Sequence, residues 1–315
     1  MDRVSTTNSY NIVLSGILRA QQTQNEANTQ LSTGKKATDL RGFSSDSQTL
    51  VAARTVKVQT ESYIKLNENL SRKLDTQNIY LTSTADAADT ARQAIANAIA
   101  NSSGTALMET LKLQFSAAVD SLNGQNEGQY LFGGSQTSTK PVNVTSMSDL
   151  PDPAVPNAID AIFSNDSEVQ TSRLNDATSV TTGMTASDIG KDLMTVFANI
   201  QTYFTTNSVP PAVAFGSTLT TAETAFLTTQ MQSLASVHSG LTDHAALNGS
   251  IAKGVATTIT SQKARVDTID SMTSDLSGIN EAETVSRLRL AQQAVQAGAQ
   301  VFLALKSSSL LNYLN

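Results

Sequence analysis

The amino-acid sequence predicts a mainly α-helical protein: a long antiparallel coiled-coil helical bundle with paired terminal helices and an inserted small β-containing domain. Three observations lead to this fold class. Apolar residues recur at alternating steps of three and four over most of the chain. All six prolines lie between residues 141 and 211. The elements that precede this stretch are mirrored by those that follow it, so we expect both termini at the same end.

The composition excludes several classes of protein. Only 39% of the residues are hydrophobic and 5% are aromatic, while Ala, Ser, Thr, Gln and Asn dominate, as suits long helices with small contact residues. The absence of cysteine excludes disulfides, thiolate metal sites and cysteine nucleophiles. A net charge of −6 argues against nucleic acid. No apolar run approaches the ~20 residues of a membrane span, and the first nine residues lack the apolar stretch of a cleaved signal peptide.

A first helix is predicted over residues 10–33. A second apolar row, Leu14 and Leu18, lies beside its main stripe, and Gly34 follows where a left-handed cap would end the helix. The main stripe, interrupted only by one glutamine, consists of Tyr10, Val13, Ile17, Ala20, Gln24, Ala27 and Leu31.

A much longer helix follows a linker at residues 34–46. Its stripe continues without a skip for about 55 residues, or roughly 80 Å, so it must pack along another helix of similar length. The stripe consists of Ala53, Val56, Thr60, Tyr63, Asn67, Leu70, Leu74, Gln77, Leu81, Thr84, Ala88, Ala91, Ile95 and Ala98.

Gly104 allows a reversal into a third helix, which carries Leu111 and Leu122 and ends at Asn123–Gly124. Residues 129–134 then form an apolar strand closed by two glycines, which predicts a hairpin arm. The composition changes at Pro141. Residues 141–211 carry 2 basic and 8 acidic side chains, so we infer an inserted acidic domain over roughly 141–186. Its β-like stretches are residues 142–144, 169–171 and 179–181.

Helical periodicity returns at Ser187, which we predict as the N-cap, and Pro210–Pro211 interrupts it. Another helical stretch covers about 217–276, with three glycines in its middle, and Ser277–Gly278 marks a joint. The last helix, residues 279–314, carries two apolar rows. One row is Leu288, Ala291, Val295, Gly298, Phe302 and Leu305, and the other is Leu290, Ala294, Ala297, Val301, Ala304 and Leu311.

The predicted organisation therefore has five parts. They are an N-terminal assembly helix (1–40), a helical rod with the hairpin (41–140), the inserted acidic outer domain (141–186), the returning rod (187–277) and a C-terminal assembly helix (278–315).

The residues offer little for catalysis. The two histidines, His238 and His244, lie six residues apart, whereas a zinc pair on a helix needs a spacing of four. Neither a nucleotide-binding glycine pattern nor a nucleophile elbow occurs. We expect no cofactor, no metal and no enzymatic activity; a lyase or hydrolase using His244 and Asp243 is the weakest alternative.

The terminal helices predict a surface for assembly. Each carries two apolar rows, and pairing the helices with each other would cover only one row on each, so neighbouring subunits would cover the rest. The predicted subunit-interface residues are Ile12, Val13, Leu14, Ile17, Leu18, Leu31, Val295, Val301, Phe302, Leu305, Leu310, Leu311 and Tyr313.

Two terminal stretches, Gln30–Lys36 and Glu281–Leu314, resemble those of the flagellin superfamily. Within it, the hairpin Gln129–Gly134 and the ending Ser308–Leu314 are most similar to the flagellar hook–filament junction protein family, hook-associated protein three. The resemblance covers roughly residues 1–140 and 187–315. It implies export without a cleaved signal peptide to an extracellular flagellum. It also implies contacts with neighbouring copies, another hook-associated protein, flagellin and an export chaperone.

Two other functions stay open at this point. The nearest is a flagellin that forms the filament itself. The second is a sensory coiled-coil signalling module, because receptor rods also use Ala, Ser, Thr and Gln on long helices. Such modules usually attach to membrane spans or input domains, and neither is visible in this sequence.

Overall fold

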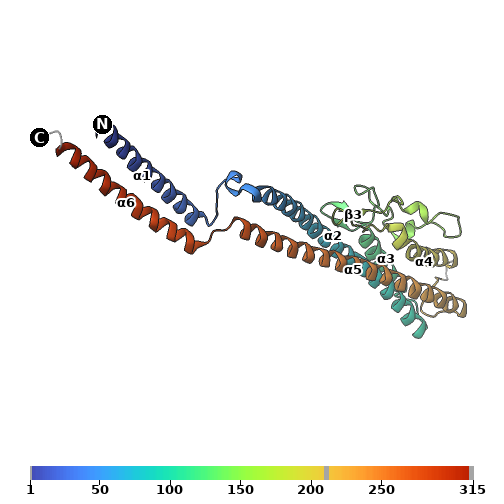
Figure 1. The fold of residues 1–315 in the computed structure, drawn as a ribbon. Helices are drawn as coiled ribbons and strands as arrows, with labels where there is room; N and C mark the ends of the chain where they lie inside the picture. Colours follow the sequence, from blue (N-terminus) through green and yellow to red (C-terminus); the bar gives the residue numbers. More distant parts are fainter. Residues whose placement is uncertain (1, 209–212, 312–315) are drawn as a thin grey trace. The chain divides into compact units, whose positions relative to one another are not determined.

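The computed structural model describes residues 2–208 and 213–311, and only the backbone of residues 2–7, 45 and 308–311. Helices dominate these residues, with small strand pairs between them, which confirms the mainly α-helical fold class (Figure 1). The chain divides into two compact units. The first unit joins residues 1–60 to residues 264–315, and the second unit is residues 61–263.

The first unit contains the terminal helices α1 (Asp2–Thr33) and α6 (Glu281–Leu311), which pair along their length (Figure 1). The predicted end of α1 is confirmed: Gly34 follows at a φ of 67°, and its N–H donates to the carbonyl of Gln30. The predicted start at residue 10 is wrong. The apolar stripe begins only there, but residues 2–9 contain no glycine or proline that would stop the helix.

The joint of the first unit lies where predicted, at Ser277–Gly278. The N–H of Lys36 donates to the carbonyl of Ser277 at 2.8 Å, and Lys35 pairs with Gly278 in an isolated antiparallel bridge. A 3₁₀ turn, η1 (Leu40–Asp46), then leads into α2 (Ser47–Ala100). These contacts fix the linker of residues 34–46 against the end of α5 (Thr221–Ser277).

In the second unit, α2 and α5 run antiparallel. Asn248 donates from Nδ2 to the carbonyl of Leu74 at 2.8 Å, and Nδ1 of His238 lies 3.1 Å from the carbonyl oxygen of Ala85. The predicted stripe of α2 faces inward, and no position from Asn67 to Ala98 on this stripe is exposed. Helix α5 continues through its three central glycines. A Cβ at any of them would meet open space, so they do not interrupt packing.

Helices α3 (Leu107–Leu122) and α4 (Ala186–Asn207) complete this core. The rings of Phe115 and Phe197 meet edge to face at 5.6 Å. The predicted cap of α4 is wrong. Thr185, not Ser187, has the extended backbone of an N-cap, and its hydroxyl accepts the N–H of Asp188. Ser187 already lies inside the helix.

The predicted hairpin arm exists, but with a different turn. Strands β1 (Gln125–Asn126) and β2 (Gln129–Tyr130) pair around Glu127 and Gly128, both at positive φ. The two-residue turn thus precedes residues 129–134, and Gly133–Gly134 does not form it. Gly133 instead bridges Thr185.

Strands β3 (Thr171–Arg173) and β4 (Ser179–Thr181) form a second antiparallel pair. The strand predicted at 179–181 is confirmed, and the one predicted at 169–171 lies two residues later. Residues 142–144 contribute only an isolated bridge from Val142 to Phe163. Short 3₁₀ turns, η2 (Met147–Asp149) and η3 (Asp160–Ile162), bury Met147 and Ile162 in the core of the helices. The five-part domain organisation stays a prediction.

Candidate assembly surface

The pairing of α1 with α6 uses the main apolar stripe of each helix, here called the inner rows. The rings of Tyr10 and Phe302 meet edge to face, with centroids 5.6 Å apart. Gly298 lets the helices approach closely, because a Cβ there would come within 2.6 Å of Cγ1 of Ile17. All members of both inner rows are buried or half-buried. They are Tyr10, Val13, Ile17, Ala20, Gln24, Ala27 and Leu31 on α1, and Leu288, Ala291, Val295, Gly298, Phe302 and Leu305 on α6.

Gln30 ties the end of this helix pair to the joint. Its Oε1 accepts a hydrogen bond from Nη2 of Arg287 at 2.8 Å, and its Nε2 donates to the carbonyl of Lys36 at 2.8 Å. The Nζ of Lys36 in turn donates to the carbonyl of Leu276. One side chain therefore links α1, α6 and the linker, which holds the two inner rows in register.

Large apolar side chains remain exposed outside the inner rows. They are here called the outer residues, and their exposed fractions run from 47% to 64%. Single exposed apolar side chains are common in monomeric proteins, but several gathered on one helix pair mark a candidate interaction surface. The outer residues are Ile12, Leu14 and Leu18 on α1, and Leu290, Val301 and Leu303 on α6.

The outer residues lie on both sides of the helix pair. Each residue of an α-helix turns about 100°. Ile12 therefore points about 100° to one side of the inner row of α1, and Leu14 and Leu18 point about 120° to the other. The same reasoning on α6, which runs antiparallel, places Leu290 and Val301 on the side of Ile12. A single two-fold contact buries one patch per subunit, so two apolar sides favour head-to-tail contacts with two neighbours.

The structure assigns the predicted interface residues to different places. Ile12, Leu14, Leu18 and Val301 are exposed, whereas Val13, Ile17, Leu31, Val295, Phe302 and Leu305 are half-buried. The side chains of Leu310 and Leu311 are not described, and Tyr313 lies outside the described residues. Sequence reasoning did not select Leu290 or Leu303 as interface residues. Leu290 was visible in the second predicted row, but Leu303 belongs to neither row. The role of all these residues in assembly stays a prediction.

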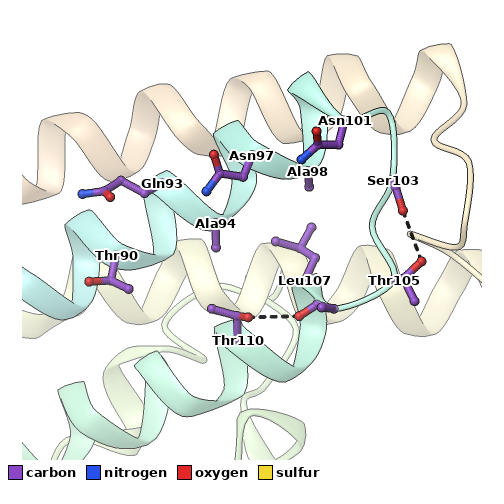
Figure 2. A pocket seen from close by; sticks show the side chains of 11 residues that line it. Thr90, Gln93, Ala94, Asn97, Ala98, Asn101, Ser103, Thr105, Leu107 and Thr110 are labelled. Carbon is purple, nitrogen blue, oxygen red and sulfur yellow. Dashed lines mark hydrogen bonds between the residues drawn. The ribbon is translucent and has the colours of Figure 1, made fainter.

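A groove in the second unit has no ionisable lining. It has a volume of about 480 Å³ and lies between the end of α2 and the start of α3. Figure 2 shows Gln93, Asn97 and Asn101 following one helix, with Leu107 and Thr110 on the facing one. The amides and hydroxyls of this lining can form hydrogen bonds, but the groove holds neither an acid nor a base.

The histidines of the chain lie on α5, outside this groove. His238 contacts the backbone of α2 through the carbonyl of Ala85. Across residues 2–208 and 213–311, no three histidine or acidic side chains converge in a way that could hold a metal ion. None of the helices described is both long enough and apolar enough to cross a membrane.

Comparisons with known proteins find similarity in structure alone. No protein-family model matches the sequence, and no curated protein matches it either. A solved structure assigned as a flagellar hook-associated protein from Vibrio parahaemolyticus matches with a TM-score of 0.57 at 16% identity; the match covers 73% of this chain and 96% of that one. FlgL of Bacillus cereus matches with a TM-score of 0.54 at 13% identity, covering 72% of this chain and 99% of that one.

These two matches cover nearly the whole of each solved chain, and both solved proteins carry names from the flagellum. The low identities mean that they establish the fold and nothing finer. The chain has the fold of the flagellar hook-associated proteins.

Proposed function

We propose that this chain is a structural subunit of the bacterial flagellum that joins the hook to the filament through its paired terminal helices. One observation carries the proposal: the α1–α6 pair keeps large apolar side chains exposed on both of its sides. Burying a fully exposed side chain of this size contributes about 1.5–3 kcal/mol, and because these six are about half exposed, each would contribute roughly half of that to a contact between subunits.

The fold supports the flagellar setting. Both matched structures have flagellar names, and each match spans nearly the whole of the solved chain. In this role the chain would act outside the cell, and a chaperone would hold it before export. Its neighbours would be copies of itself, another hook-associated protein and flagellin. No catalytic step belongs to this function.

The alternatives make different use of the same surfaces. A flagellin would bury the outer residues against other flagellin copies along the whole filament. A sensory coiled-coil module would instead need an input domain or a membrane-attached partner.

Deleting the gene from the source bacterium separates the three functions. Loss of a junction subunit leaves hooks without filaments, and flagellin accumulates in the medium because nothing anchors it. Loss of a flagellin removes both the filament and the secreted protein. Loss of a sensory module leaves flagella intact. Electron microscopy of the cells, with immunoblots of the medium, distinguishes these outcomes, and normal flagella would overturn the proposal.

A further inference from the structure

Two stretches of the chain that meet near the joint of the first unit carry opposite net charge. Residues 35–57 hold five basic and two acidic side chains, whereas residues 264–283 hold one basic and five acidic ones. These stretches lie in the same compact unit, so their charges would be expected to neutralise each other within the chain.

Little of that neutralisation happens. Lys57 forms an ion pair with Asp270 at 2.5 Å, and the Nζ of Lys36 binds a backbone carbonyl. Among the residues that the structure describes, seven other charged side chains of these two stretches are exposed and form no ion pair. They are Lys35, Arg41 and Arg54 on the basic stretch, and Asp267, Asp275, Glu281 and Glu283 on the acidic one.

Several of these charges are explained within the chain. Lys35 follows the C-terminal end of α1, and Glu281 and Glu283 occupy the first turn of α6, so each is favoured by its helix dipole. Asp275 is different. It lies in the last turn of α5, where the dipole disfavours a negative charge and where no basic residue accompanies it. Arg54 on α2 likewise has no partner that would account for it.

Arg54 and Asp275 point to opposite sides of the α2–α5 pair. The facing surfaces are set by Val56 and Thr60 on α2 and by Val266 and Thr273 on α5, which are buried or half-buried. At about 100° per residue, Arg54 points about 140° away from the facing surface of α2, and Asp275 points about 170° away from that of α5. Since the helices are antiparallel, the two side chains point outward from the pair in roughly opposite directions.

We propose that Arg54 of one copy meets Asp275 of a neighbouring copy in a head-to-tail contact, so that the partner of this surface is a second copy of the chain. A two-fold dimer brings the same side of both copies together, so charges on opposite sides of the helix pair cannot meet in it. In a ring or helical array, one side of each copy meets the other side of the next, so Arg54 and Asp275 can pair in every contact. An exposed pair contributes modestly to affinity and more to register and specificity. This inference rests on the proposed assembly of copies and adds the residues that set their register.

Cysteine cross-linking tests the contact directly, because the chain has no cysteine of its own. Val58 lies one turn from Arg54, and Ser271 lies one turn from Asp275. Both are exposed, and a contact that sets Arg54 against Asp275 also sets Val58 against Ser271. A disulfide within one chain is excluded, since both side chains point away from the other helix and disulfides need Cα atoms closer than about 7 Å.

The variant V58C/S271C is oxidised in intact cells of the deletion strain and its products are separated by size. We expect a ladder of dimers and higher species, whereas either single cysteine gives monomer. Adding Arg54→Glu or Asp275→Arg should lower the yield about tenfold, since attraction becomes repulsion. The combined reversal R54E/D275R should restore it. Lys65→Glu on α2 and Asp243→Arg on α5, both exposed and in the second unit, are matched controls and should leave the ladder unchanged.

Three results would overturn the inference: no ladder, dimers from a single cysteine, or single reversals that cross-link as well as the parent. None of them bears on the flagellar role, which the deletion phenotype decides separately. A strain with normal flagella but a clear ladder would retain the contact and remove the proposed function.

Discussion

Gly298 on α6 lies directly against Ile17 on α1, so closely that a Cβ at position 298 would come within 2.6 Å of Cγ1 of Ile17. We expect Gly298→Val to force the terminal helices apart. Overpacking of this kind costs about 1–3 kcal/mol. Limited proteolysis of the full chain would measure the effect as faster cleavage within α1 and α6.

The control for this substitution is Gly254→Val on α5. It makes the same change in a helix interior, but a Cβ at 254 meets nothing within 4 Å. Equal protease sensitivity of the two variants would show that helix propensity, rather than the contact with Ile17, explains the result.

Introducing a charged side chain should have different effects in the inner rows and at the outer residues. Leu18 is exposed, so Leu18→Asp should change the free energy of unfolding by less than about 0.5 kcal/mol while preventing the variant from restoring filaments in the deletion strain. Ile17 is half-buried beside Gly298, so Ile17→Asp should also loosen the helix pair. Thermal unfolding and electron microscopy of complemented cells measure the two effects. Filaments formed normally by Leu18→Asp cells would refute the assembly surface.

Glu223 should make the second unit sensitive to acid. Its carboxylate accepts the N–H groups of Thr220 and Phe215 at 2.7 Å, while the Thr220 hydroxyl accepts the N–H of Glu223, a capping box for α5. Burial alone would raise the pKa of Glu223, but these hydrogen bonds outweigh it and leave the pKa below its usual value. The stabilisation is therefore complete above the unfolded pKa of about 4.3 and is lost as the pH falls through the lower folded pKa.

Comparing the chain with Glu223→Gln isolates this contribution. Urea unfolding at pH 7 should show the variant less stable by about 1–2 kcal/mol, because charged acceptors make stronger hydrogen bonds. At about pH 3 the difference should shrink, since wild-type Glu223 is then increasingly protonated. A constant difference across this range would contradict the role of the ionised carboxylate.

Much of the helical fold could be predicted because the spacing of apolar residues separates the buried face of a helix from its exposed face, even when the helix that packs against it is unknown. The two rows read on residues 279–314 are the half-buried and the exposed rows of α6, apart from Leu311, whose side chain is not described. The stripe of α2 was read through Asn67, Gln77 and Thr84, and all three are buried. Position along a heptad predicted burial here better than the polarity of the side chain did.

Local geometry set by distant contacts could not be predicted. Phe215 has a φ of 56°, and its backbone lies where a Cβ on Gly104 would have to be; these residues are more than a hundred positions apart. Thr185 caps α4 in place of Ser187 because Asn165 already engages Ser187 from the insert. Arg54 and Asp275, outside the candidate surface, lack any sequence signal, because their lack of partners appears only once α2 and α5 are paired.

The buried polar residues of the rod should separate into two kinds. Asn67 donates to the carbonyl of Leu174 and to Oε1 of Gln262, so it holds the β3–β4 loop against both long helices. Gln77 is only 1% exposed, and neither of its amide atoms has a hydrogen-bond partner among the described residues. We expect Gln77→Leu to raise the free energy of unfolding by about 1–2 kcal/mol, since it removes a desolvated amide at similar volume. Asn67→Leu makes the same kind of change but leaves Oε1 of Gln262 without this donor, and should lower stability by about 1–3 kcal/mol. Urea unfolding of both variants measures the contrast. A loss of stability in Gln77→Leu would contradict the prediction, since it would mean that Gln77 stabilises the rod in a way that its contacts do not account for. A gain of stability in Gln77→Leu together with a loss in Asn67→Leu would show that the buried polar residues that stabilise the rod are those that form hydrogen bonds across the helices.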